Sequence, residues 1–283
     1  MTSTPPIDLD RDALENLVKN AGKLLLGYFG VRGHLQVVEK DGAGDYVTNA
    51  DKAVQEDIFK GLKEMFPEHR RTGEEILHEG DSNIYTPPDS PNGFTWVVDP
   101  VDGTYNLTRG IADFAVTIGL LQGGWPTFGI IYLPVTDELF SGGTHWVPRL
   151  NGSPLNSLEA YNSHDAFAGI GLGERTPKPE RSQFLAALDE EKVKFRRIGS
   201  ASVSFVQVML GNTDGYVSLS ERLWGIVGGI AILNAMGAVG TFDWERGNFN
   251  GRLRLAVGKR GFIEDKVRDG GILAAFLEQS NPQ

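Results

Sequence analysis

The first part of the chain shows a helical pattern of apolar residues. Over residues 9–29 apolar side chains recur every three or four positions, and these are Leu14, Leu17, Val18, Ala21, Leu24, Leu25 and Phe29. Residues 50–65 repeat the pattern, with Pro67 behind them and Thr48 or Asn49 in front as a candidate N-cap. The spacing therefore predicts two amphipathic helices, each with one buried face.

Shorter apolar runs in the middle of the chain predict strands. They cover residues 94–98, 114–121, 127–133 and 138–141. Glycine and proline residues separate these runs, and such residues favour tight turns between neighbouring strands. We expect an antiparallel meander in this part of the chain.

The last third of the chain alternates between the two patterns. We expect strands at residues 166–172, 215–219, 239–243 and 252–258, and helices at residues 180–189, 201–210, 223–236 and 266–279. Two helices before a sheet, followed by alternating helix and strand, predict an α+β fold of mixed sheets with helices between and outside them. We expect a single domain over residues 1–283, with subdomains at 1–150 and 151–283.

Composition and charge exclude several classes of protein. The chain has 283 residues, a formal net charge of −10 and no cysteine. The charge argues against nucleic acid and anionic membranes as partners, and the lack of cysteine excludes disulfides, thiolate metal sites and cysteine nucleophiles. The sequence shows neither a signal-peptide pattern nor an apolar run of about 18 residues, the length a membrane span needs. We therefore expect a cytoplasmic protein.

The segment "WVVDPVDGTYNL" places two carboxylates directly after an apolar run. Asp99 and Asp102 are separated by only two residues, one of them Pro100, and are followed by Gly103 and Thr104. Pro100 favours an extended chain that then turns, and Gly103 permits a tight bend before a helix that begins at Thr104. Two hard oxygen ligands beside a helix start suit Mg²⁺ and a phosphate together. A polar turn with a capping aspartate explains the spacing equally well.

Two upstream clusters add further carboxylates. Glu74 and Glu75 follow Gly73, near the expected start of a strand, and "DYVTNAD" contains Asp45 and Asp51. Taken alone, the glutamates fit a solvated turn and Asp51 fits a helix start. Taken together, the clusters hold more carboxylates than their few basic residues can pair. A divalent cation would resolve that excess.

The motifs "GDYVTNAD", "TGEE", "WVVDPVDGTYNL" and "GSAS…GNTDGYV…LW" occur in an order that resembles the inositol monophosphatase family. The resemblance runs from about residue 10 to about residue 260. It implies a layered αβαβα sandwich of the sugar-phosphatase type, a Mg²⁺ cofactor, a small phosphorylated substrate and a homodimer. It also implies hydrolysis of a phosphate monoester, such as an inositol, sugar or polyol phosphate.

The resemblance assigns metal ligands to four positions. The first metal site maps onto Glu74, Asp99 and the backbone carbonyl of Val101. Asp102 matches a ligand of a second site. These assignments agree with the carboxylate excess found from the sequence alone.

The resemblance also assigns the groups that act on water and phosphate. Thr104 and Asp51 match the pair that orients and deprotonates the attacking water, with Glu74 beside them. The backbone N–H groups of Gly103 and Thr104 match the phosphate-binding groups. Lys40 matches, more loosely, a basic residue near the phosphate.

The sequence departs from the family pattern at the second metal site. Trp224 is in place, but the aspartate expected after it is Gly225. This change removes a carboxylate ligand and leaves Asp102. Glu221 is the nearest acidic replacement, although a glutamate at a helix start is also explained by helix electrostatics.

The substrate-facing positions depart from the pattern as well. Ser218 stands where inositol phosphatases carry an acidic residue, and Ser200 and Ala201 match positions that contact the substrate body. A loop over residues 173–183 carries three basic residues that could contact a second anion or simply be exposed, and these are Arg175, Lys178 and Arg181.

Three functions remain open from the sequence. The first is Mg²⁺-dependent hydrolysis of a small phosphate monoester by a metal-activated water. The second is a catalytically impaired relative that binds a phosphorylated ligand, for which Gly225 is the evidence. The third is an enzyme that binds a phosphorylated substrate but performs other chemistry on it.

Overall fold

The computed structural model describes residues 7–30, 35–39, 46–77, 85–86, 93–173, 176–244, 249–268, 271 and 273–277. Its α-helices are α1 (Arg11–Leu26), α2 (Asn49–Met65), α3 (Thr104–Arg109), α4 (Lys178–Glu190), α5 (Ala201–Met209), α6 (Leu223–Ala235) and α7 (Arg260–Phe262). Three short helical turns, η1 (Ser163–Asp165), η2 (Ile263–Val267) and η3 (Ala274–Phe276), complete the helical elements of these residues.

A seven-stranded sheet is formed by the middle of the chain. Its strands, in spatial order, are β3 (Arg70–Gly73), β4 (Phe94–Asp102), β5 (Ala115–Gln122), β6 (Trp125–Leu133), β7 (Glu138–Gly143), β8 (Trp146–Leu150) and β9 (Ser153–Pro154). All neighbours are antiparallel except the parallel pair β3 and β4. The predicted meander is therefore confirmed.

A five-stranded mixed sheet is formed later in the chain. Its spatial order is β11 (Lys194–Arg196), β10 (Phe167–Gly171), β12 (Gly215–Glu221), β14 (Leu253–Gly258) and β13 (Val239–Gly240). β10 is parallel to β11 and to β12, whereas β14 is antiparallel to both of its neighbours. A separate antiparallel hairpin pairs β1 (Val37–Glu39) with β2 (Tyr46–Thr48).

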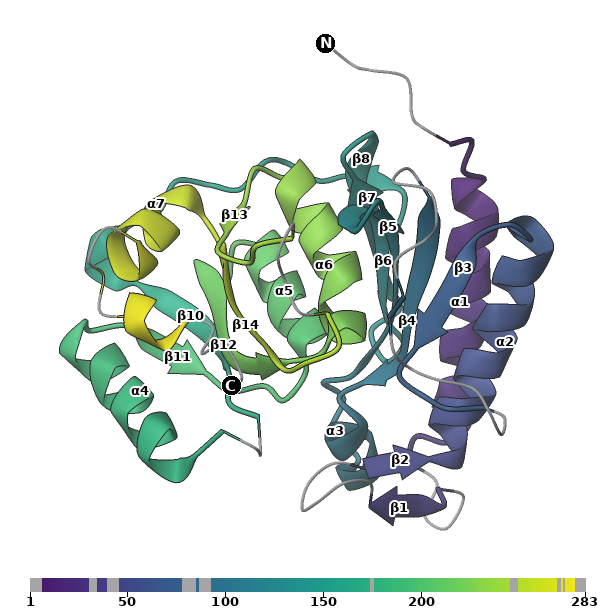
Figure 1. The fold of residues 1–283 in the computed structure, drawn as a ribbon, viewed down its shortest axis with the longest axis horizontal. Coiled ribbons are helices and arrows are strands. Elements are labelled where there is room, and N and C mark those ends of the chain that lie inside the picture. Colours follow the sequence, from purple (N-terminus) through teal and green to yellow (C-terminus); the bar gives the residue numbers. More distant parts are fainter. Residues whose placement is uncertain are drawn as a thin grey trace.

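The elements stack in five layers, as Figure 1 shows. α1 and α2 cover one face of the seven-stranded sheet, α5 and α6 lie between the two sheets, and α4 and α7 lie outside the smaller sheet. The predicted α+β sandwich with layers in the order αβαβα is confirmed. Each interface between layers buries an apolar cluster, which is the usual requirement for a layered fold.

Helix α6 fits between the sheets because glycines allow its backbone to approach the strands. A Cβ atom at Gly129 of β6 would lie 2.1 Å from the carbonyl oxygen of Gly228, and one at Gly228 would lie 2.6 Å from that of Ile118. Only glycine at both positions permits this contact. α6 is apolar on almost all sides, as expected for a helix covered on both faces. This packing fixes where the first turn of α6 lies.

Most predicted elements are present, and three expectations were wrong. Residues 266–279 do not form one helix in the described part of the chain, which contains only the short turns η2 and η3 there. Gly270 and Gly271 are poor helix formers in the middle of that range. Glu74 follows the end of β3 instead of preceding a strand, and β4 continues through Asp102 instead of ending at residue 98.

None of the helices in the described ranges is both long enough and apolar enough to cross a lipid bilayer.

Candidate active site

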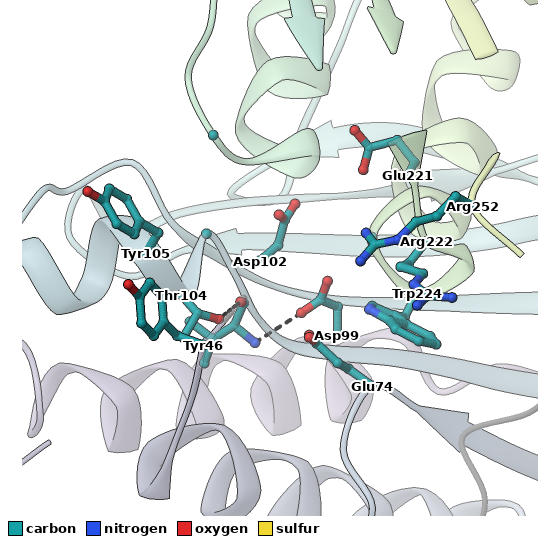
Figure 2. Close-up of a pocket in the computed structure, with 14 residues that line it drawn as sticks. Tyr46, Glu74, Asp99, Asp102, Thr104, Tyr105, Glu221, Arg222, Trp224 and Arg252 are labelled. Atoms are coloured by element: carbon teal, nitrogen blue, oxygen red, sulfur yellow. Dashed lines mark hydrogen bonds between the residues drawn. The ribbon is translucent and has the colours of Figure 1, made fainter. Parts of the chain in front are cut away.

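A pocket of about 210 Å³ opens where the two sheets face each other at one end of α6. Figure 2 shows that its residues come from both halves of the fold. Its lining consists of Tyr46, Glu74, Asp99, Val101, Asp102, Gly103, Thr104, Tyr105, Gly199, Glu221, Arg222, Trp224, Gly225 and Arg252. The volume suits a small ligand, and the lining is unusually rich in charged groups.

An irregularity at the end of β4 brings Asp99 and Asp102 to this pocket. Asp99 is opposite Thr117 on β5 and Asp102 is opposite Ala115, so the register shifts between the two carboxylates. Side chains three positions apart would otherwise point to opposite faces of a strand. Gly103 then turns the chain into α3 with φ of 101°, in a space where a Cβ would lie 2.9 Å from the Asp113 carbonyl oxygen. The turn therefore requires glycine.

Hydrogen bonds of the Glu74 and Glu75 backbone to β4 and α2 fix the position of Glu74. Its N–H donates to the carbonyl oxygen of Val98 over 3.2 Å. The neighbouring Glu75 backbone exchanges two hydrogen bonds with the Gln55 side chain of α2, at 2.7 and 2.9 Å. The end of β3 is thus fixed between α2 and β4, and Glu74 lines the pocket beside Asp99.

The Asp51 side chain both caps a helix and contacts a residue of the pocket. At the first turn of α2 it closes a capping box, in which its Oδ2 accepts bonds from the Thr48 backbone N–H at 2.8 Å and the Thr48 hydroxyl at 2.5 Å. Its Oδ1 faces the Thr104 hydroxyl at 3.0 Å. The same hydroxyl lies 2.9 Å from the Val101 carbonyl oxygen. Thr48 thus orients Asp51 so that one carboxylate oxygen remains directed at Thr104.

Asp102 is held by the beginning of α5. Its Oδ1 accepts a hydrogen bond from the Ala201 N–H at 3.3 Å, and its Oδ2 accepts one from the Ser202 N–H at 2.5 Å. Ser200 caps the same helix by accepting a bond from the Val203 N–H. The first turn of α5 therefore partly compensates the buried charge of Asp102.

Burial and mutual repulsion raise the pKa values of this cluster. Burial, followed by the negative charge of Glu74, raises the pKa of Asp51 to about 6. Burial, followed by the charges of Glu74, Asp102 and Asp51, holds the pKa of Asp99 well above its usual range. Burial also raises the pKa of Asp102, although bonds from Ser202 and its neighbours oppose the shift. Carboxylates in such a cluster favour protons or a bound cation.

The donor set fits a divalent cation. Asp99, Asp102 and Glu74 supply only hard oxygen ligands, which Mg²⁺ prefers, and their charges repel one another in a buried pocket. Within the ranges that the structure describes, no three acidic, histidine or cysteine side chains already converge as a cation cage. A cation would therefore have to draw these side chains together.

Glu221 brings a further carboxylate to the pocket from the end of β12. Its Oε1 accepts bonds from the Tyr216 hydroxyl at 2.5 Å and the Ser218 hydroxyl at 2.7 Å. A register shift between Ser218 and Glu221 turns the end of the strand toward the pocket. Burial raises the pKa of Glu221 to about 7, those two hydrogen bonds oppose the rise, and the charge of Asp102 adds to it.

Comparison with known proteins shows the family of this chain. A family model described as "Inositol monophosphatase family" matches residues 9–280. A fructose-1,6-bisphosphatase/inositol-1-monophosphatase of Aquifex aeolicus is 31% identical over 74% of this chain and 76% of its own. Inositol monophosphatase 1 of Solanum lycopersicum is 32% identical over 82% of this chain and 83% of its own. The chain belongs to the inositol monophosphatase family.

The solved structures agree in fold. The structure of the extragenic suppressor protein SuhB from Bartonella henselae has a TM-score of 0.77 and 26% identity, over 95% of this chain and 98% of that one. Some proteins similar to this chain are thus named as phosphatases, and another is named as an extragenic suppressor protein. Membership alone does not choose between them for this chain.

The structure places most of the family-matched residues around one pocket. Glu74, Asp99, Val101, Asp102, Gly103 and Thr104 line it, and Asp51 reaches it through Thr104. Ser200, Ala201 and Ser218 do not line it. The first two support Asp102 from α5, whereas Ser218 lies behind Glu221. Lys40 and Arg175 lie outside the described residues, and neither Lys178 nor Arg181 lines this pocket.

Gly225 marks the departure from the inositol monophosphatase pattern in three dimensions. It lies in the first turn of α6 and lines the pocket. A Cβ atom there would lie 3.4 Å from Oδ2 of Asp99 and, apart from its own helix turn, would meet no other atom within 4 Å. The position is therefore open beside the Asp99 carboxylate.

Sequence reasoning missed five residues that line the pocket, namely Tyr46, Tyr105, Gly199, Arg222 and Arg252. The two tyrosine rings stack with their centroids 5.9 Å apart. Arg222 directly follows Glu221 and lies two positions before the expected Trp224, which is a local signal. Arg252 had none, because only the pairing of β14 with β12 brings it to the pocket.

Proposed function

We propose that this member of the inositol monophosphatase family hydrolyses a small phosphate monoester with Mg²⁺ as cofactor. The proposal rests on the hydrogen-bonded set formed by Thr48, Asp51, Thr104 and the Val101 carbonyl, beside the carboxylates of Asp99 and Glu74. Such an arrangement combines a general base with ligands for a hard cation.

Different residues of the pocket would bind the cations and the phosphoryl group. Glu74, Asp99 and the Val101 carbonyl would hold the first cation, and Asp102 would hold the second. The N–H groups of Gly103 and Thr104 would hold the phosphoryl group. When bound, Mg²⁺ supplies Lewis-acid polarisation of the phosphoryl oxygens and neutralises the carboxylates that surround it.

Thr104 and Asp51 act on the attacking water. The Thr104 hydroxyl donates to Oδ1 of Asp51, at 3.0 Å, which leaves its oxygen lone pairs to accept a hydrogen bond from water. The pKa of Asp51, raised to about 6 by burial and by Glu74, suits a base that works near neutral pH. As water attacks, its oxygen bonds to phosphorus, its proton passes through Thr104 to Asp51, and the ester P–O bond breaks. The leaving alcohol oxygen keeps that electron pair and takes up a proton from solvent.

A second candidate function is binding of a phosphorylated ligand without efficient turnover. Gly225 favours it, because the missing carboxylate weakens the second cation site. Loss of charge stabilisation at a two-metal site costs orders of magnitude in rate. Retention of the whole Asp51–Thr104 arrangement favours hydrolysis.

One experiment separates the two functions. Phosphate release is measured from a panel of inositol, sugar, polyol and amino-alcohol phosphates, with and without Mg²⁺. Release that depends on Mg²⁺ supports hydrolysis. No release by folded protein, together with a ligand-induced rise in melting temperature, supports binding alone. A product that keeps its phosphate supports other chemistry.

The family resemblance supports a homodimer, and the net charge and sequence pattern support the location and partners proposed here. We infer a cytoplasmic homodimer whose ligand is small and phosphorylated, with neither nucleic acid nor a membrane as partner. Light scattering at micromolar concentration tests the dimer directly.

A further inference from the structure

One side of the pocket carries positive charge in an otherwise acidic site. Arg222 and Arg252 line the pocket together with Trp224. Figure 2 shows them across the carboxylates from Thr104 and Tyr105. The arginines come from the smaller-sheet half of the fold, whereas Thr104 begins α3 next to the larger sheet. The pocket therefore has two ends of different chemistry.

Both arginines interact with neighbouring groups at this end. Arg222 immediately precedes α6, donates to the Asn250 carbonyl oxygen at 3.3 Å, and lies over the Trp224 ring at 5.6 Å from the centroid. Arg252 immediately precedes β14, and its charge interacts with that of Glu221, where it opposes the rise in pKa that burial causes. A guanidinium has five N–H donors in a planar fork, so an arginine with such contacts still presents donors to an anion.

Gly225 changes the charge balance at the same end. The family pattern has a carboxylate here, and in this chain a Cβ at Gly225 would face, apart from its own helix turn, only Oδ2 of Asp99. Its loss removes one negative charge from beside Arg222. The first turn of α6 has no side-chain cap, so Asp99 is the carboxylate that faces this positive helix end at Gly225. The change that weakens a cation site thus favours an anion.

We propose that Arg222 and Arg252 bind a second anionic group of the substrate. The substrate is then a phosphate monoester that carries a carboxylate or a second phosphate at the end away from the transferred phosphoryl group. This inference rests on the proposed function, because the first phosphoryl group is the one placed at Gly103 and Thr104. Arginine pairs bind planar carboxylates and phosphates in a bidentate way, so they select doubly anionic ligands.

Matched probes test the inference. Glycerol 3-phosphate and 3-phosphoglycerate differ only in a hydroxymethyl group replaced by a carboxylate, and fructose 6-phosphate and fructose 1,6-bisphosphate differ by one phosphate. Binding of each probe is measured by calorimetry at fixed ionic strength and free Mg²⁺, in a Thr104→Ala background so that turnover does not consume it. Turnover is measured separately, with Thr104 intact, as kcat/KM. The variants are Arg222→Gln and Arg252→Gln, and Arg196→Gln is the control, since Arg196 is exposed on β11 and does not line the pocket.

The expected result is a preference for the doubly anionic member of at least one pair by about tenfold or more. Arg222→Gln and Arg252→Gln each reduce that preference to less than about threefold, with little change for the singly anionic member. Arg196→Gln changes neither value. The pair that responds tells whether the second group is a carboxylate or a phosphate.

Three results would overturn the inference. The first is equal binding of both members of each pair, and the second is no binding of any probe at millimolar concentration. The third is an equal loss for both members in the arginine variants, which would place the arginines on the transferred phosphoryl group. A preference in binding without any phosphate release would instead contradict the proposed hydrolysis and leave the second-anion site standing.

Discussion

Gly225→Asp restores the carboxylate that the family pattern places at the second cation site. In the structure the new Cβ would lie 3.4 Å from Oδ2 of Asp99 and, apart from its own helix turn, would meet no other atom within 4 Å. The substitution is therefore sterically tolerated, and its effect is electrostatic. Gly225→Asn is the matched control, because it has the same shape without the charge.

The magnitude follows from the separation of the two charges. The new carboxylate would stand roughly 4 Å from that of Asp99, and two such charges repel by about 4 kcal/mol at an effective dielectric constant of about 20. Replacing glycine in a helix and placing an acid at a helix start together return about 1–2 kcal/mol. The metal-free variant should then lose about 2–3 kcal/mol, or roughly 3–5 °C in melting temperature for a chain of this size.

Mg²⁺ should turn the destabilising effect of Gly225→Asp into a stabilising one. The added carboxylate becomes a ligand, so the rise in melting temperature per addition of Mg²⁺ should be larger in Gly225→Asp than in the natural chain. The assay is a series of thermal melts at pH 8, first in chelator and then over a Mg²⁺ titration. Turnover at saturating Mg²⁺ should also rise, because the second cation is held more tightly.

Two outcomes would refute this reasoning. If the aspartate and asparagine variants melt together in chelator, the new charge does not face Asp99. If their Mg²⁺ midpoints also coincide with that of the natural chain, the open space at Gly225 is not a cation position. In that case the weak second site would need another explanation.

The remaining predictions concern the base, the cation and pH. Thr104→Ala should lower kcat by about 10²-fold or more with little change in melting temperature, whereas Thr108→Ala on the same helix should leave phosphate release unchanged. Asp99→Asn should raise the metal-free melting temperature, because it removes a buried like charge, and should abolish the stabilisation by Mg²⁺. Metal-free stability should fall as pH rises from about 4 to about 7, because burial raises the pKa of Asp51 to about 6 and that of Glu221 to about 7. Melts in chelator should show a loss of about 3 kcal/mol from Asp51 alone, and Glu221→Gln should flatten the upper part of the curve.

The sign of that pH effect follows from proton linkage. Both carboxyls keep their protons in the folded state to a higher pH than in the unfolded state, so ionisation destabilises the fold. The penalty is absent below the ordinary pKa values and is complete above about pH 7. Stability that instead rose over this range in chelator would show that the carboxylates are compensated within the protein.

Much of the fold could be read from the sequence because its signals are local. The apolar periods of α1 and α2, the turns between β5, β6 and β7, and the Thr48 cap all follow from residues close together in the chain. The same holds for Gly103, whose left-handed conformation is encoded by the residue itself. The four motifs quoted above, in their order along the chain, then indicated the inositol monophosphatase family.

The mistakes came from places where distant contacts decide the local structure. β4 continues through Pro100 to Asp102 because β5 pairs with it there, although proline and glycine predict an earlier end. Glu74 follows a strand because Val98 and Gln55 fix the backbone around it. Residues 266–279 have helical spacing, yet only short turns form among the residues described there.

The sequence by itself determined the family, the layered fold and the carboxylates and threonine that make hydrolysis the expected chemistry. The tertiary structure decided where those groups lie relative to one another. It directed one oxygen of Asp51 at Thr104, showed that Gly225 leaves an open space beside Asp99, and brought Arg222 and Arg252 to the same pocket. The physical reason is that a residue type and its spacing set what a side chain can do, whereas the packing of two sheets around α6 sets which other groups it meets.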